Sequence, residues 1–82
     1  MENKLVTVPP GKCLIVKDLN DHSATARREQ LGPGHYLFRD NGTYLVIVKV
    51  IIDGKRKKLP GKTRWGLTWA GLQAQGYAQE EP

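Results

Sequence analysis

The sequence predicts a mostly β protein, built as a small antiparallel sheet with one short helix near the C-terminal end. Two dipeptides typical of tight hairpins, Asn41-Gly42 and Asp53-Gly54, separate stretches that are rich in β-branched and aliphatic residues. Proline and glycine recur between the other extended stretches, where they stop a strand and turn the chain. The polar segment 20–30 lacks the apolar stripe of an amphipathic helix. These observations favour strands over helices for most of the chain.

The chain has 82 residues, of which 39% are apolar and 26% charged, an ordinary globular composition. This length allows one domain with a limited core. We expect that domain to span residues 1–79 and to fray from Tyr77, and residues 80–82 to form an acidic tail.

The N-terminal part is expected to form two strands, over residues 4–8 and 12–19, divided by a turn at Pro9-Pro10-Gly11. Cys13 is the single cysteine, and within the second strand it is expected to be a small buried apolar residue. The polar segment 20–30 leaves two alternatives open. It can form one or two helical turns after a cap at residues 21–23, or it can remain a loop.

A turn at Leu31-Gly32-Pro33-Gly34 is expected to start the next strand at His35. This strand and the one over residues 43–52 should form a hairpin with Asn41-Gly42 as its two-residue loop. The second strand is apolar on both faces, which is typical of a strand in the middle of a sheet. The expected facing pairs are Asp40 with Thr43, Phe38 with Leu45 and Tyr36 with Ile47.

Asp53-Gly54 should return the chain into a strand over residues 55–59. A two-residue turn would place Lys55 and Lys57 on the same face as apolar Val50 and Ile52. Either a bulge shifts the register, or the hairpin extends past the core into solvent. We favour the second alternative, which makes this segment an extended, cationic β-ribbon.

Pro60-Gly61 should end the ribbon, and residues 62–67 are expected to return to the sheet as a short edge strand. Thr68 can cap a helix over residues 69–75 that Gly76 closes. If the helix began early enough to include Trp65, then Trp65, Trp69 and Leu72 would share one apolar face. The whole pattern gives five or six strands, as an antiparallel sheet or a half-open SH3-like barrel.

The basic residues of the chain are concentrated in one segment. Ten positions, 55–64, hold six of the thirteen lysines and arginines and no acid, while the rest of the chain has seven basic and eight acidic residues. Such a patch beside tryptophans favours binding of nucleic acid, in which cations follow the phosphates and a ring stacks on a base. Arg27 and Arg28 extend the patch only if segment 20–30 folds over it. The candidate nucleic-acid-binding residues are Lys55, Arg56, Lys57, Lys58, Lys62, Arg64 and Trp65.

Other interpretations of the same residues stay open. The lysines can keep an edge strand solvated, and each tryptophan can close the core. The second functional hypothesis is a protein-binding or assembly module, like the small accessory proteins of phages and other mobile elements, acting on an acidic partner or as a homo-oligomer. Nucleic-acid binding requires exposed, unpaired Lys55–Lys58 near an aromatic ring. Assembly instead predicts a large uncovered apolar patch around Val46–Ile52.

Neither a catalytic nor a metal-binding motif is found, so we expect no enzyme activity, metal or cofactor. His35 is expected to be a polar residue at a strand end. The longest apolar runs are too short to span a membrane, and the first residues do not have the pattern of a signal peptide, which together predict a cytoplasmic protein.

The segment from Arg64 to Leu72, Arg-Trp-Gly-Leu-Thr-Trp-Ala-Gly-Leu, is similar to the junction of wing and helix in winged-helix DNA-binding domains. In that family a strand runs into Leu-Thr-x-x-Gly, and the preceding hairpin is often basic and lies near the DNA backbone. The resemblance implies the same position for residues 55–64 here. The chain departs from the family upstream, where strands are expected in place of a helix-turn-helix.

Overall fold

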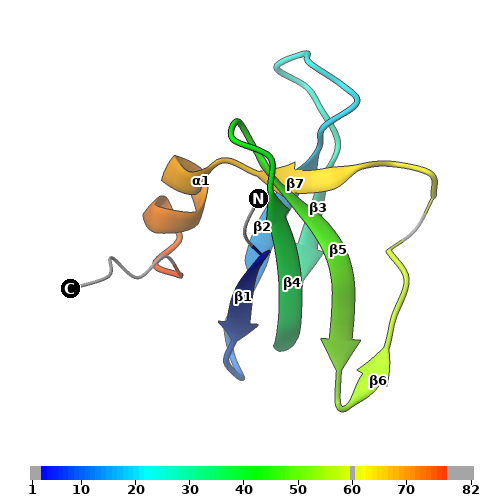
Figure 1. Ribbon diagram of the computed structural model, residues 1–82, viewed down its shortest axis with the longest axis vertical. Helices are drawn as coiled ribbons and strands as arrows, with labels where there is room; N and C mark the ends of the chain where they lie inside the picture. The colour runs from blue at the N-terminus through cyan, green and yellow to red at the C-terminus, as the bar shows by residue number, and fades with distance from the viewer. Residues whose placement is uncertain (1–2, 60, 78–82) are drawn as a thin grey trace.

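The computed structural model describes residues 3–59 and 61–77, which form an open antiparallel sheet and a short helix (Figure 1). The mostly β prediction with a C-terminal helix is confirmed, with seven strands in place of five or six. The expected acidic tail, residues 80–82, lies outside the described residues. The elements are β1 (Asn3–Val8), β2 (Leu14–Asp18), β3 (Arg28–Leu31), β4 (Gly34–Asp40), β5 (Leu45–Ile52), β6 (Lys55–Arg56), β7 (Trp65–Leu67) and α1 (Trp69–Ala74).

The strands lie in the order β1-β4-β5-β7-β2-β3, and β6 pairs with β5 beside this path. β7 therefore has β5 on one side and β2 on the other, so the expectation of an edge strand at residues 62–67 is wrong. Gly66 permits this interior position. A Cβ at Gly66 would collide with the Leu45 carbonyl oxygen and would lie 2.6 Å from Leu19 Cδ1.

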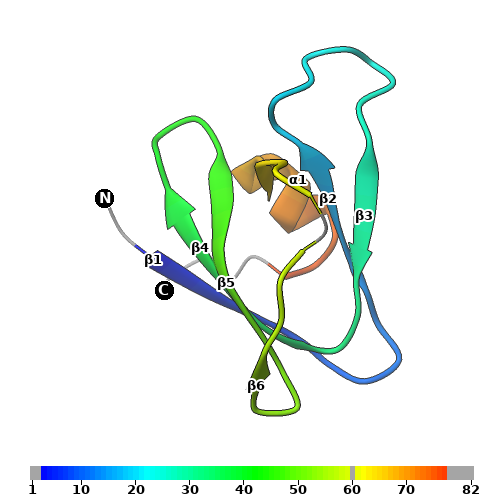
Figure 2. The same cartoon turned by 90° about the vertical axis from the view of Figure 1, so that its right-hand side faces the viewer.

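The core lies on the inner face of the curved sheet, and α1 packs against it (Figure 2). Tyr36 and Phe38 of β4 are fully buried, and Leu72 is the residue by which α1 joins the core. Thr68 caps the helix as expected, with its Oγ1 accepting a hydrogen bond from Gly71 N at 3.0 Å. Trp69 is 37% exposed, with Lys4 Nζ 4.7 Å from its ring centre, so it covers the core only in part.

The hairpin between β4 and β5 is where the Asn-Gly pair predicts it, but its register is different. Asp40 faces Leu45, so the loop has four residues, and the expected pairing of Asp40 with Thr43 is wrong. Asn41 causes the longer loop, because its Oδ1 accepts hydrogen bonds from the backbone N of Thr43 and Tyr44. Phe38 consequently faces Ile47 rather than Leu45, and after a bulge at residue 48 Tyr36 faces Val50 rather than Ile47.

The polar segment 20–30 contains no helix. Its first part is a series of turns, in which Asp21 Oδ1 accepts a hydrogen bond from Ser23 N, and its last part is strand β3. β3 pairs with β2 over four residues, from Leu14 opposite Leu31 to Lys17 opposite Arg28. Leu31 is buried and fixes the strand on the core, whereas the other three side chains of β3 are exposed or half-buried.

The start of β2 and the end of the described chain are joined. Cys13 precedes β2 and is exposed, so the expectation of a buried strand residue is wrong. Its carbonyl oxygen accepts a hydrogen bond from the Tyr77 hydroxyl at 3.1 Å, and Tyr77 N donates to Leu72 O. The expected fraying therefore does not begin at Tyr77.

Candidate functional site

The most positively charged stretch of the chain begins directly after the turn of the second hairpin. Asp53 and Gly54, with φ of 53° and 75°, form the expected two-residue turn, and Ile52 faces Lys55. β6 ends at Arg56, and one more backbone hydrogen bond, from Lys57 N to Val50 O at 3.0 Å, is the last contact of this ladder. The expected extended β-ribbon over residues 55–59 is therefore wrong, because the chain leaves β5 to reach β7.

We call residues 55–64 the basic segment, and the structure describes all of it except residue 60. After β6 this segment runs in the direction of β7 alongside β5 but at a distance from it (Figures 1 and 2). All six of its cationic side chains are exposed, and none of them forms an ion pair with a residue in the described part of the chain. The predicted cations are Lys55, Arg56, Lys57, Lys58, Lys62 and Arg64, and they are thus held on one connection between two strands.

Because the basic segment moves away from β5 after β6, one edge of β5 is paired over only part of its length. One side of β5 pairs with β4, and the other side pairs with β7 at Leu45–Val46 and with β6 at Ile51–Ile52. Between these two short ladders, Ile47–Lys49 has no strand on that side among the residues that the structure describes. We call this three-residue interval the β5 gap.

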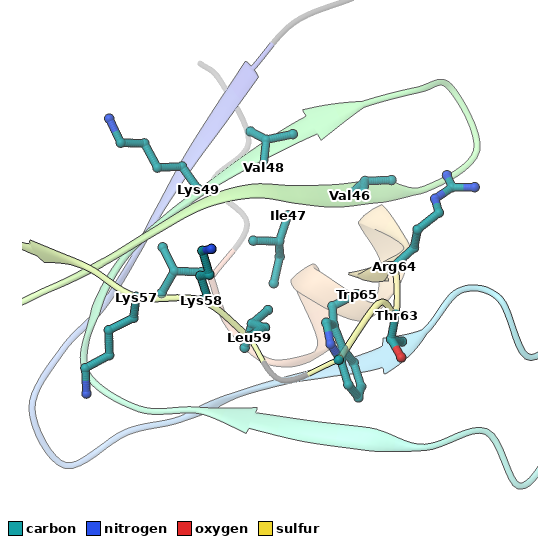
Figure 3. Close-up of a pocket in the computed structure, with 12 residues that line it drawn as sticks. Val46, Ile47, Val48, Lys49, Lys57, Lys58, Leu59, Thr63, Arg64 and Trp65 are labelled. Atoms are coloured by element: carbon teal, nitrogen blue, oxygen red, sulfur yellow. The ribbon is translucent and has the colours of Figure 1, made fainter.

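A cavity of about 390 Å³ opens at the β5 gap. One wall is residues 46–50 of β5, and the other is formed by residues 57–59, Gly61 and residues 63–65. Ile47 and Leu59 point toward one another between the two walls, while Val46 and Val48 lie on the opposite face of β5 (Figure 3). The cavity is therefore apolar at its centre.

The rim of the cavity is cationic. Lys57 and Arg64 lie at opposite ends of it, with Lys58 beside β5, whereas the side chain of Lys49 points away from the cavity (Figure 3). None of the described lining residues is an aspartate or a glutamate. The site therefore combines an apolar interior, a row of positive charges and a stretch of strand edge, which suits a ligand with negative charges and a flat apolar part.

Trp65 lies in the core rather than on the surface. It is 3% exposed in β7, where it lines the inner end of the cavity, so its ring does not offer the open face that base stacking requires. This is the alternative in which the tryptophan closes the core. Trp69 on α1 is not among the lining residues.

Arg27 joins the site, although nothing in the sequence places it there. Its guanidinium carbon lies 5.5 Å from the centre of the Trp65 ring. Two consecutive residues at the end of β2 hold the arginines in position: Asp18 N donates to Arg27 O at 2.8 Å, and Leu19 N donates to Arg64 O at 2.7 Å. Segment 20–30 thus brings Arg27 next to the basic segment, whereas Arg28 pairs opposite Lys17 at the sheet edge.

The apolar surface around Val46–Ile52 is limited. Val48 is 43% exposed, Val50 is buried, and the other aliphatic residues of this stretch are half-buried. Leu5 on β1, at 66%, is the most exposed of the large apolar residues in the described chain. The stretch therefore lacks the broad uncovered patch that an assembly role predicts.

Within residues 3–59 and 61–77, no three His, Cys, Asp or Glu side chains are grouped so as to hold a metal ion. The same ranges contain no helix with the length and apolar character needed to cross a bilayer. His35 lies in β4, exposed, with its Nδ1 2.9 Å from Thr7 Oγ1.

Comparison of the chain with protein-family models, with curated proteins and with solved structures finds no significant match.

Proposed function

We propose that the protein is a non-catalytic module that binds nucleic acid through the basic segment. The observation that carries this proposal is the exposure of all six cations of the segment, unpaired among the described residues. Three of them, Lys57, Lys58 and Arg64, line a cavity whose described lining has no acid. Unpaired lysines and arginines attract phosphate oxygens and release the counterions of a polyanion.

The distribution of charge supports a polyanion over a small anion. The cations extend from the β5–β6 turn to the start of β7 instead of converging on one point. A nucleic-acid backbone repeats its negative charges along its length, so several phosphates can be contacted at once. Exposed lysines spread along a connection suit backbone contacts, which position the protein without reading sequence.

Binding should be measured by fluorescence anisotropy with single-stranded DNA, double-stranded DNA and RNA over a series of salt concentrations. Six phosphate contacts on a single strand predict a slope of log affinity against log salt of about −4, since each contact contributes about −0.7. In the triple variant Lys55→Gln, Lys57→Gln, Lys58→Gln the slope should decrease in magnitude by about 2.

A matched control removes three charges elsewhere: Lys12→Gln, Arg28→Gln, Arg39→Gln, all exposed and outside the cavity. This control should bind nearly as the native chain does. Equal losses in the two triple variants would mean that net charge alone is responsible. Absence of binding at low salt would reject the proposal and favour an acidic protein partner.

A further inference from the structure

We infer that the cavity at the β5 gap takes one unstacked nucleobase of a single-stranded nucleic acid. This inference rests on the proposed function and adds to it the form of the ligand and the place of one base. The cavity and the phosphate-binding surface share Lys57, Lys58 and Arg64, so a strand held by these cations passes directly over the opening.

The lining matches the two chemical parts of a base. Ile47 and Leu59 point toward one another in the lining (Figure 3), and the part of each side chain that the core does not cover can contact the flat apolar face of a ring. Thr63 and the strand edge of residues 47–49 supply polar groups for the hydrogen-bonding edge of the base. A volume of about 390 Å³ lies near the lower end of the range for small-molecule sites, which suits a single base with its sugar.

The same geometry disfavours a duplex. In a double helix both faces of each base are stacked and its polar edge is paired, so the base would first have to be flipped out at a cost. In a single strand the base is already accessible, which is why sequence-tolerant single-strand binders place aromatic rings beside a cationic groove. In this protein Ile47 and Leu59 would take the place of those rings. The site should therefore prefer single strands.

The geometry also disfavours a peptide added to the sheet. The β5 gap spans three residues, about 10 Å of strand, and it is closed at one end by β7 and at the other by β6. A peptide that adds a strand needs a continuous free edge, with room for the chain to enter and leave along it. A base enters from the side and needs no such length.

The first test uses the native protein with two labelled single strands that have the same phosphates. One strand carries bases throughout, and the other is abasic at every position. Loss of bases should weaken binding by about tenfold, or about 1.4 kcal/mol, which corresponds to the burial of roughly 55 Å² of apolar ring surface. A 2-aminopurine placed in the full strand should brighten on binding, because its fluorescence rises when the base leaves the stack.

The second test fills the cavity without changing charge. Thr63→Phe should reduce single-strand affinity by about tenfold and abolish the 2-aminopurine signal, while duplex binding stays the same. Thr63→Ser, which leaves the cavity open, should behave as the native protein. Thermal unfolding followed by circular dichroism checks that both variants fold. If Thr63→Phe does not fold, the comparison of the full and abasic strands on the native protein tests the inference without it.

The two proposals fail in different ways. If the abasic and full strands bind equally well, with the expected dependence on salt, the basic segment binds phosphates but the cavity takes no base. If an acidic extended peptide displaces the full strand and is itself blocked by Thr63→Phe, the cavity is a peptide site and the inference is overturned. If no nucleic acid binds at low salt, both proposals are wrong.

Discussion

The guanidinium of Arg27 lies over the ring of Trp65, at 5.5 Å from its centre, and joins a surface loop to the inner end of the cavity. The arginine is exposed and the tryptophan is buried, so the stem of Arg27 covers the side of the core nearest the basic segment. The contact has the geometry of a cation–π interaction.

Replacing Arg27 should therefore affect stability and the surroundings of Trp65. Arg27→Ala should lower the free energy of unfolding by about 0.5 to 1 kcal/mol, and Arg27→Lys should lower it less. Urea unfolding measures the free energy of unfolding. In a Trp69→Phe background the fluorescence emission of Trp65 should shift to the red, which reports the change in the surroundings of its ring. Arg28→Ala removes a neighbouring exposed arginine, and an equal response to this control would contradict the specific contact.

Single lysines of the basic segment should act mainly through phosphate contacts. Lys58→Gln should weaken binding of single strands of every sequence to the same degree, and should reduce the salt slope by about 0.7. Lys12→Gln, an exposed lysine outside the cavity, serves as the control and should leave the slope unchanged. Anisotropy titrations at four salt concentrations are sufficient. A change confined to one oligonucleotide sequence would show that Lys58 reads bases.

Gly66 should tolerate no side chain. In Gly66→Ala the new methyl group meets the Leu45 carbonyl oxygen and Leu19, so β7 must move away from β5. Overpacking of this kind costs about 1 to 3 kcal/mol, and sometimes more. Gly32→Ala is the matched control, because a Cβ at Gly32 meets nothing within 4 Å and its φ is not positive. Urea unfolding of both variants decides whether β7 needs this close approach.

Tyr36 should make the protein less stable at high pH. Burial raises the pKa of its phenol above 10.0, and its hydroxyl donates a hydrogen bond to Gly32 O at 2.5 Å. The folded state thus holds the proton more tightly than the unfolded state does. The resulting stability is fully present below about pH 10, the pKa of an unfolded tyrosine, and is lost as the pH rises through the higher folded pKa.

Tyr36→Phe isolates this effect. At pH 7 the variant should be about 1 kcal/mol less stable than the native protein, because the hydrogen bond is lost. The difference in stability should shrink between pH 9 and pH 11, because ionisation of the phenol in the unfolded state destabilises the native protein and not the variant. Urea unfolding at several pH values measures the difference in the free energy of unfolding at pH 7 and its change up to pH 11. A difference that stays constant up to pH 11 would mean that the phenol ionises equally well in the folded state.

The cap of α1 should contribute to stability through one hydrogen bond. Thr68→Ala removes the acceptor for Gly71 N and should cost about 1 kcal/mol, whereas Thr68→Ser keeps the acceptor and should cost much less. Because Leu72 anchors the helix in the core, the loss should appear in global thermal unfolding rather than in local fraying alone. Similar melting temperatures for the two variants would exclude a role for the cap.

Local chemistry was sufficient to predict both hairpins and the helix. Asn41-Gly42, Asp53-Gly54 and the Thr68 cap act through their own backbone torsions and side-chain oxygens, so a sequence reveals them directly. The length of the first loop was missed because the Asn41 side chain bonds two successive amides, which the dipeptide alone does not indicate.

Features that depend on distant partners could not be predicted in the same way. Residues 28–30 are polar and become a strand only because β2 offers them a partner. The cavity exists because β6 and β7 meet β5 at separate places, and Arg27 reaches Trp65 through the end of β2. The charge of the basic segment was visible in the sequence, whereas the opening beneath it depends on the tertiary arrangement.

The three residues of β7 are the only described link, by strand pairing, between the ribbon β1-β4-β5 and the ribbon β2-β3. Among the described strands, β7 is also the last to be synthesised. A nascent chain that ends before Trp65 can form the ribbon β1-β4-β5 and the ribbon β2-β3 but cannot join them. It presents the unpaired edges of β5 and β2 to its surroundings. Completion of the sheet, and with it closure of the cavity wall, therefore waits for the synthesis of β7, which joins strands that were made well before it.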